Sequence, residues 1–269
     1  MLTLTKNIIK EIRALEQRKG RREQCAWLVE GNKSVGDLLE AGAFRCLRLV
    51  ATSEWWQAHP KARATECYEA TRNAMERVSL LPSPQDVLAV MEMPERNEIS
   101  KISGKPDYTN ETDELCIALD EVQDPGNLGT IIRTADWFGV RQIYCAPGTA
   151  DCFAPKVVQA TMSALARVRV HYFETREQMR EWLLSYPGDV YGTFLEGENI
   201  YNSSLNANGV LLMGNEGRGI GDDLKECVSK KVLIPDFAPD GKHVESLNVS
   251  VATAVCLSEM RRNLKSSKP

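Results

Sequence analysis

Residues 118–140 read ALDEVQDPGNLGTIIRTADWFGV and pass from an apolar strand, through an Asp-Pro-Gly turn, into a helix. The helix is predicted to begin at about Asn127, because asparagine is a favoured N-cap residue. Its apolar positions are Leu128, Ile131, Ile132, Ala135 and Phe138. Their helical spacing predicts one buried face. A strand that turns directly into such a helix is the unit from which α/β folds are built.

The same alternation of strands and helices continues to the end of the chain. Strands are predicted at 115–121, 142–146, 168–173, 189–194, 210–214 and 231–234. Helices are predicted at 127–138, 155–166, 176–185, 222–228 and 247–262. This pattern predicts the α/β class, here a mostly parallel sheet with helices on both faces. Ligands of such sheets lie beyond the carboxyl ends of the strands, and the polar segments of this sequence follow strands.

A smaller α/β unit is predicted before residue 95. Residues 5–20 form an amphipathic pattern with an apolar stripe, and Gly20 is expected to end that helix. Strands are predicted at 25–31, 46–52 and 85–90, with helical segments between them. The size of this unit is normal for an independent domain.

A polar stretch separates the two units. Residues 94–113 contain two prolines and one glycine and lack hydrophobic periodicity, which is typical of a linker. We therefore expect a first domain at 1–95, a linker at 96–113 and a second domain at 114–269.

Composition places the chain among ordinary globular proteins, with 43% hydrophobic and 26% charged residues. No segment has the ~20 apolar residues of a membrane span, and no signal peptide is visible, so we expect a cytoplasmic location and no membrane partner. The eight cysteines form no Cys-x-x-Cys pair and fall in apolar runs, which indicates buried thiols. With only three histidines, far apart in sequence, no metal site is expected.

Charge is unevenly distributed along the chain. The net charge is −4, whereas residues 1–24 carry seven basic and three acidic side chains, a local +4 that leaves −8 for the rest. A basic arm of this kind is compatible with docking to phosphate groups. It is equally compatible with a solvated helix face.

Three segments carry groups capable of chemistry. In the first, Arg133 lies within an otherwise apolar helix and needs a partner. A purely structural explanation would pair it with Asp120, Glu121 or Asp136.

The second segment, 210–221, reads VLLMGNEGRGIG and opens from a strand into a glycine-rich turn. Its spacing matches neither nucleotide-binding glycine motif. Its glycines allow a ligand to approach the backbone closely. Glu216 would repel phosphate and tolerate a cation such as a sulfonium. Taken alone, the segment is most simply a turn.

The third segment, 232–259, ends in ESLNVSVATAVCLSE, and its helix is predicted to begin at Ser246 or Leu247. Small residues along this helix allow close packing, within the chain or across a dimer. Taken alone, it is a buried helix with a good cap.

Together the three segments resemble the motifs DPxNxGxxxRxA, GxEGxG and ESLNVSxA of the SpoU family of RNA 2′-O-methyltransferases, within the SPOUT superfamily. The order and spacing of the three are similar as well, and the stretch APKVVQATMSALARV also resembles the family. Residues 10–42, KEIRALEQRKGRREQCAWLVEGNKSVGDLLEAG, resemble the family's N-terminal substrate-binding domain, which looks like α/β RNA-binding proteins of the ribosome. The resemblance implies a deep trefoil knot, a rare exception to unthreaded folds.

The resemblance also implies a cofactor, S-adenosylmethionine, and a set of site residues. The implied catalytic set is Asn127, Arg133, Glu216, Ser246 and Asn248. The implied cofactor contacts are Met213, Gly214, Ile234 and Leu247, with Thr193 as a weaker candidate. Arginine is a poor base because its pKa exceeds ~12, so Arg133 is expected to clamp phosphate and stabilise the developing alkoxide.

Partners and alternatives follow from the same resemblance. It implies an RNA substrate, with ribosomal RNA favoured over transfer RNA, and a homodimer packed partly through the last helix. Two departures from the family pattern bear on substrate choice and cofactor affinity: Ser163 replaces a usual glycine, and the 236–244 loop is long. A non-catalytic RNA-binding protein of the same fold stays open. A nucleotide-dependent oxidoreductase would need G-x-G-x-x-G after its first strand, where this chain has Asp-Pro-Gly-Asn.

Overall fold

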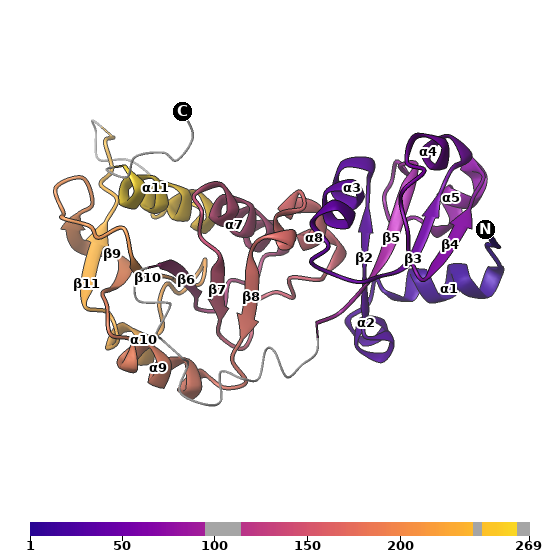
Figure 1. Cartoon of the computed structure of the whole chain (residues 1–269). Helices are drawn as coiled ribbons and strands as arrows, with labels where there is room; N and C mark the ends of the chain where they lie inside the picture. The colour runs from indigo at the N-terminus through magenta and orange to yellow at the C-terminus, as the bar shows by residue number, and fades with distance from the viewer. Residues whose placement is uncertain (95–113, 239–243, 263–269) are drawn as a thin grey trace. The chain divides into compact units, whose positions relative to one another are not determined.

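The computed structural model describes residues 1–94, 114–238 and 244–262 (Figure 1). It divides into two compact units, one of Met1–Glu95 with Asp151–Arg167 and one of Arg96–Ala150 with Val168–Pro269. The predicted linker at 96–113 and part of the 236–244 loop lie outside the described residues.

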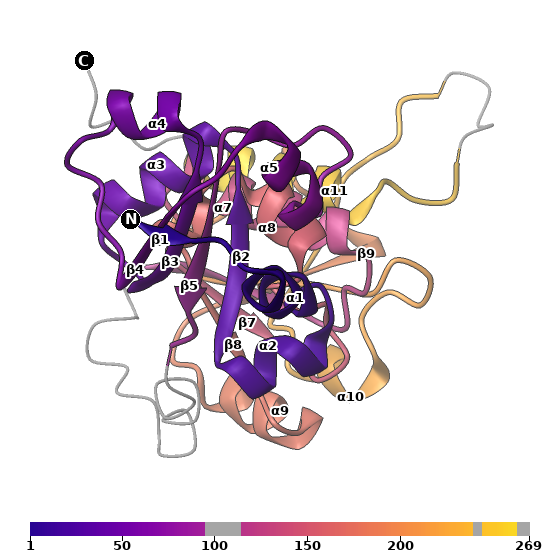
Figure 2. The ribbon, with the colours of Figure 1, turned by 90° about the vertical axis from the view of Figure 1, so that its right-hand side faces the viewer.

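The N-terminal unit contains a mixed five-stranded sheet in the order β1-β4-β3-β5-β2. β5 runs antiparallel to β2 and β3, whereas β1, β4 and β3 are mutually parallel. Its strands are β1 (Leu2–Thr3), β2 (Ala26–Glu30), β3 (Cys46–Ala51), β4 (Glu66–Glu69) and β5 (Val87–Glu92). Its first helices are α1 (Lys6–Ala14), α2 (Arg18–Gln24), α3 (Asn32–Ala41), α4 (Ser53–Ala58) and α5 (Arg72–Val78). α1 and α5 lie over this sheet (Figure 2), and their apolar side chains belong to the same buried core as those of the strands.

The predicted single helix at 5–20 is wrong, because α1 ends at Ala14 and α2 begins at Arg18. Gly20 does not end a helix but lies inside α2. A Cβ atom at Gly20 would stand 2.0 Å from the carbonyl oxygen of Ala14, so only glycine lets α2 fold back onto the end of α1. The close approach of two helices, rather than helix termination, explains this glycine.

A segment from the middle of the chain completes the N-terminal unit. It contains α8 (Pro155–Thr161) and a short 3-10 helix (Ala164–Ala166). Arg21, only 3% exposed, donates to Asp151 Oδ2 at 2.7 Å, and the rings of Trp27 and Phe153 lie 5.1 Å apart. The helix predicted at 155–166 is shorter in the structure. It ends at Thr161, because Met162 and Ser163 adopt left-handed backbone conformations. Ser163, with φ of 71°, donates its hydroxyl to Asp37 Oδ2 at 2.6 Å.

The second unit contains a six-stranded sheet in the order β11-β9-β10-β6-β7-β8. Every neighbouring pair is parallel, as the alternation predicted. Its strands are β6 (Leu115–Leu119), β7 (Gln142–Cys145), β8 (Arg169–Tyr172), β9 (Val190–Asn199), β10 (Gly209–Met213) and β11 (Lys230–Leu233). Its helices are α7 (Pro125–Trp137), α9 (Arg176–Ser185), α10 (Asp222–Lys225) and α11 (Val249–Arg261).

Helices cover both faces of this parallel sheet, which confirms the prediction (Figure 1). α9 and α10 pack their apolar side chains against one face, through Trp182 and Leu224 among others. α7 and α11 contact each other on the other side. The central strands β6 and β10 are continuous apolar runs because they are buried on both faces. β6 and β10, adjacent at the centre of the sheet, lead directly into the first two motif segments.

Candidate active site

The start of α7 places Asn127 differently from the prediction. Asp124 is the N-cap residue, and its side chain accepts the backbone N–H of Asn127 at 2.8 Å. Pro125 takes the first helical position, where its fixed φ suits the helix and its missing N–H costs nothing. The prediction that Asn127 caps the helix is therefore wrong. Because Asp124 caps the helix, the side-chain amide of Asn127 is available for contacts elsewhere.

A chain of hydrogen bonds joins one residue from each motif. Asn127 donates from Nδ2 to Glu216 Oε1 at 3.0 Å, and Asn248 donates from Nδ2 to Asn127 Oδ1 at 2.9 Å. Asn248 Oδ1 in turn accepts the backbone N–H of Ser250 at 3.0 Å. Because each amide has a donor on one side and an acceptor on the other, the orientation of both is fixed. We call Glu216, Asn127 and Asn248 the amide relay.

The start of α11 explains how Asn248 joins the amide relay. The helix begins at Val249 with Asn248 as its N-cap, and not at Ser246 or Leu247 as predicted. Ser246 and Leu247 lie in the preceding chain and are exposed, Leu247 by 48%. The cap oxygen of Asn248 binds the helix while its amide nitrogen serves the relay. The Asn248 side chain therefore both caps α11 and takes part in the amide relay.

The turn after β10 holds Glu216 in position. Asn215 and Gly219 exchange two backbone hydrogen bonds of 2.9 Å, and Gly219 has φ of 69°. A Cβ atom at Gly214 would stand 2.2 Å from the carbonyl carbon of Gly219, so the two backbone segments are in close contact. Glu216 also accepts the backbone N–H groups of Gln123 and Asp124, both at 3.4 Å. A carboxylate beside the start of α7 is additionally favoured by the helix dipole.

Arg133 is exposed on α7 and makes no hydrogen bond or ion pair with another described residue. The carboxylates that could have paired with it are engaged elsewhere. Asp120 and Glu121 bind Arg176, at 2.5 Å and 2.8 Å, and Asp136 binds Arg141 at 2.8 Å. The explanation of Arg133 as an internal ion pair is therefore wrong. Its guanidinium is available to an anionic ligand.

Met213, Gly214 and Ile234, among the predicted cofactor residues, lie at the carboxyl ends of β10 and β11, whereas Thr193 lies within β9 and Leu247 just before α11. Gly192 of β9 pairs in register with Leu212 of β10 and with Lys231 of β11, one residue before Thr193 and Met213. β9 continues to Asn199 instead of ending at 194, and Thr193 stands at an irregularity within it. Met213 is buried, whereas Thr193 and Ile234 are half-buried.

The chain around these strand ends leaves apolar side chains uncovered. Leu195, within β9, is 76% exposed, and Phe237 and Val244, in the chain after β11, are 80% and 73% exposed. Added Cβ atoms at Gly217 and Gly219 would meet at most one neighbouring atom, so the edge of the turn is open. Apolar side chains with accessible main chain suit a purine ring, and the nearby Glu216 carboxylate suits a cation. The residues present therefore fit an adenosine that carries a sulfonium.

Two residues that matter to this site were missed from the sequence. Asp124 could have been recognised, because Asp followed by Pro is a typical N-cap and first-turn pair. Arg176 had no local signal, since its partners Asp120 and Asp223 lie 56 and 47 residues away in the sequence.

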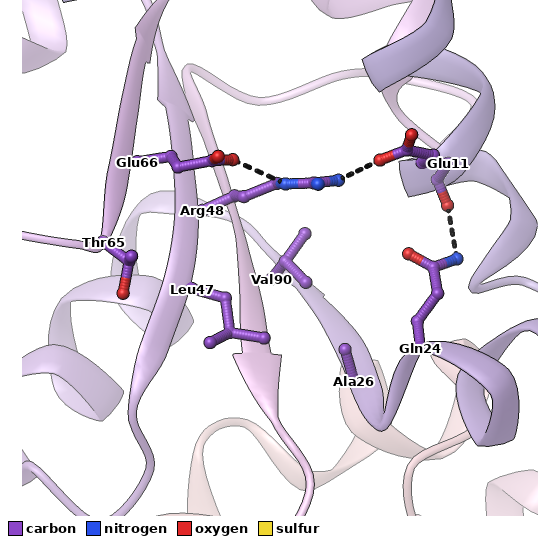
Figure 3. A pocket seen from close by; sticks show the side chains of 8 residues that line it. All are labelled: Glu11, Gln24, Ala26, Leu47, Arg48, Thr65, Glu66 and Val90. Carbon is purple, nitrogen blue, oxygen red and sulfur yellow. Dashed lines mark hydrogen bonds and ion pairs between the residues drawn. The ribbon is translucent and has the colours of Figure 1, made fainter.

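A separate groove of about 410 Å³ lies in the N-terminal unit (Figure 3). Ala26, Leu47 and Val90 line it together with charged side chains. Arg48 donates to Glu11 at 2.7 Å and to Glu66 at 2.8 Å, as the dashed lines show (Figure 3). Because these charged groups satisfy one another, they attach α1 to the sheet, and we assign no ligand to the groove.

Within the described residues, no three His, Cys, Asp or Glu side chains are grouped so that they could hold a metal ion. All eight cysteines lie in the described ranges and none forms a disulfide. No helix of the described chain is long and apolar enough to cross a bilayer.

Two family models match the chain, in the order that the motifs predicted. The model of the SpoU rRNA methylase family matches residues 114–258, and that of the MRM3-like substrate binding domain matches residues 6–89. The chain belongs to the SpoU rRNA methylase family. The resemblance drawn from the three motifs is thereby confirmed.

Individual relatives extend over nearly the whole chain. The 23S rRNA (guanosine(2553)-2'-O)-methyltransferase RlmP of Bacillus subtilis is 28% identical, with 94% of this chain and 95% of that protein covered. A putative RNA methyltransferase of the TrmH family from Porphyromonas gingivalis is 38% identical with a TM-score of 0.82, over 96% of this chain and 98% of that one. An AdoMet-bound rRNA methyltransferase from Sinorhizobium meliloti is 31% identical with a TM-score of 0.84, over 98% and 99% of the two chains.

Proposed function

We propose that this member of the SpoU rRNA methylase family transfers a methyl group from S-adenosylmethionine to a ribose 2′-hydroxyl of ribosomal RNA. The observation that carries the proposal is the amide relay, which joins one residue from each of the three motifs. Relatives named as ribosomal RNA methyltransferases support the substrate class, and one of them was solved with AdoMet bound.

The reaction forms a bond from the ribose oxygen to the methyl carbon, breaks the bond from sulfur to that carbon, and releases the hydroxyl proton. When bound, S-adenosylmethionine supplies the methyl group as a sulfonium. A hydroxyl this weakly acidic needs its developing charge stabilised. Arg133 is exposed and has no partner among the described residues, so it can bind a phosphate and stabilise the alkoxide. Its high pKa argues against a role as base.

The other residues of the predicted set have separate tasks in this proposal. Asn127 and Asn248 orient the ribose or Arg133, and Ser246 lies exposed in the chain just before Asn248. Glu216 already accepts three N–H groups, from Gln123, Asp124 and Asn127, which supports a role in ordering its turn.

Cofactor binding is assigned to the strand ends beside the amide relay. Met213, Gly214 and Ile234 would hold the adenosine with main-chain and apolar contacts, with Leu247 and Thr193 at the edges. We further propose that this part of the chain is threaded as a deep trefoil knot, which the family resemblance implies. The first domain, 1–95, would bind the RNA, and a cytoplasmic location goes with a ribosomal substrate.

A homodimer completes the proposed site. Two side chains support a second copy as the occupant of this surface: Trp137, 85% exposed on α7, and Val251, 49% exposed on α11. Trp137 lies one turn beyond Arg133 on the same helix face, so the second copy would stand beside the proposed site. Trp137→Glu should convert a dimer to a monomer in analytical ultracentrifugation. A wild-type protein that sediments as a monomer at micromolar concentration would remove this part of the proposal.

Replacement of Arg133 by alanine tests the reaction itself. Methyl transfer from labelled S-adenosylmethionine to ribosomal RNA should fall at least a hundredfold, while calorimetry shows unchanged cofactor affinity. Full turnover by Arg133→Ala would contradict the assignment. Wild-type protein that binds no cofactor would favour a non-catalytic RNA-binding protein, and methylation of transfer RNA alone would change the substrate. Mapping the 2′-O-methyl sites lost in a deletion strain would identify the nucleotide.

A further inference from the structure

Arg176, at the start of α9, lies outside all three motifs and binds three carboxylates. Its Nε and Nη2 atoms donate to the two oxygens of Asp223 at 3.0 and 2.8 Å. Its Nη1 atom donates to Asp120 at 2.5 Å and to Glu121 at 2.8 Å. The hydrogen bonds to Asp223, and next those to Asp120, raise the pKa of the Arg176 guanidinium above its ordinary value. The charge of Arg176 is therefore fixed, and its planar group sets the positions of its partners.

Asp120 and Glu121 connect Arg176 to the turn that carries Glu216. Asp120, only 2% exposed, accepts the backbone N–H of Gly221 at the end of that turn at 2.7 Å. The carbonyl oxygen of Glu121 accepts Nδ2 of Asn215 at 2.8 Å, at the beginning of the turn. The carboxylate of Glu121 binds Arg218, in its middle. Both ends and the middle of the turn are thus bound to the two residues that Arg176 holds.

The backbone at Glu121 needs this support. Its φ of 56° lies in the left-handed region, which non-glycine residues rarely adopt and which other contacts must maintain. The chain turns here between β6 and the Asp-Pro-Gly segment that begins α7. A Cβ atom at Gly221 would stand 2.6 Å from Nη2 of Arg176, so the guanidinium also packs directly against the turn.

We propose that Arg176 is a positioning residue for methyl transfer, which holds the 214–221 turn so that Glu216 meets Asn127. This inference rests on the proposed function, because it concerns the same reaction. Arg176 touches none of the predicted catalytic residues and acts through Asp120 and Glu121. Lysine cannot replace it, since one ammonium cannot make the paired contacts to Asp223 and Asp120 together.

The chain offers a matched control in Arg180, on the same helix. Its side chain is 30% exposed, as is that of Arg176, and it also pairs with carboxylates, those of Glu177 and Glu226. Arg176→Lys and Arg180→Lys should be compared at a temperature where melting curves show both fully folded. For Arg176→Lys, kcat at saturating cofactor and RNA should fall at least tenfold, with KM for RNA within twofold. Both constants of Arg180→Lys should stay within twofold of wild type.

A double-mutant cycle distinguishes positioning from general support of the fold. In a Glu216→Ala background, where the turn no longer carries the carboxylate that meets Asn127, Arg176→Lys should cost less than twofold in kcat at saturating cofactor. Labelled methyl transfer keeps the slow background variant measurable. A tenfold cost in that background, or wild-type kcat in Arg176→Lys, would overturn the proposal. Wild-type protein without methyltransferase activity would instead refute the proposed function.

If Arg176→Lys does not fold, Asp223→Asn takes its place, because the Asp223 side chain is 43% exposed and tolerates change. It should lower kcat about threefold, and this loss should disappear in the Glu216→Ala background. Folded Asp223→Asn with wild-type kcat would overturn the proposal.

Discussion

The surroundings of two arginines in the second unit differ sharply. Arg133 stands exposed on α7 with no partner among the described residues, on the helix that also carries Asn127 of the amide relay. Arg176 has three carboxylates around it and a side chain only 30% exposed. Arg133 has no counter-ion among the described residues, whereas the positive charge of Arg176 is fully compensated by carboxylates. The difference indicates that the first region is built to meet an anionic ligand, and the second to hold the protein's own turns.

The largest expected effect is a difference in the free energy of unfolding between alanine variants of the two arginines. Arg176→Ala leaves the buried Asp120 with one backbone donor, which should lower the free energy of unfolding by about 3 kcal/mol. Arg133→Ala removes no described contact and should change it by less than about 0.5 kcal/mol. Urea unfolding of the two variants and the wild type measures both. Equal losses would mean that Arg133 has a structural partner after all.

A second comparison concerns the two tasks of Asn248. Aspartate is as good an N-cap as asparagine, so Asn248→Asp should keep the stability of α11. It cannot donate to Asn127, however, and reversing the Asn127 amide would turn its oxygen toward the Glu216 carboxylate. Methyl transfer should therefore fall at least tenfold. Initial rates and thermal unfolding measure the two effects.

Asn248→Ala is the matched variant, because it loses the cap as well as the relay. It should lose about 1 kcal/mol of stability in addition to activity. An Asn248→Asp protein with full activity would show that the amide relay is not needed for turnover.

The smallest effect is expected at Arg218, the most exposed member of the ion-pair cluster around Arg176. Arg218 pairs with Glu121, but its side chain is 70% exposed. Exposed ion pairs contribute little and are screened by salt, so Arg218→Ala should cost less than about 1 kcal/mol in urea unfolding. A loss as large as that of Arg176→Ala would move the centre of this cluster from Arg176 to Arg218.

Much of the second unit could be predicted from the sequence, because its central strands are buried on both faces. Runs such as Val210 to Met213 contain no polar residue, and they alternate with helical patterns. That combination leaves a parallel sheet as the simplest fold. The amphipathic pattern at 5–20 was less informative, because a close approach between two helices leaves no periodic signal.

The predicted site residues depended on the family resemblance, and their local geometry could not be read from the sequence. Asp124 and Asn127 are both good N-cap residues, and the rigid ring of Pro125 at the first helical position decides between them. Asn248 was placed inside the last helix rather than at its cap. The contacts of Arg176 join residues far apart in sequence, which a single sequence does not reveal.

The inserted segment Asp151–Arg167 has a consequence for how the chain is made. The N-terminal unit needs Asp151 for the buried Arg21 and Phe153 beside Trp27, yet both follow the first strands of the other unit. At roughly 5–20 residues per second of synthesis, the 73 residues from 95 to 167 take about 4 to 15 s. During that interval the strands of the first sheet have been synthesised, but the segment that places Phe153 beside Trp27 has not. The N-terminal unit therefore cannot finish folding until Arg167 has been made, although its last strand, β5, ends at Glu92.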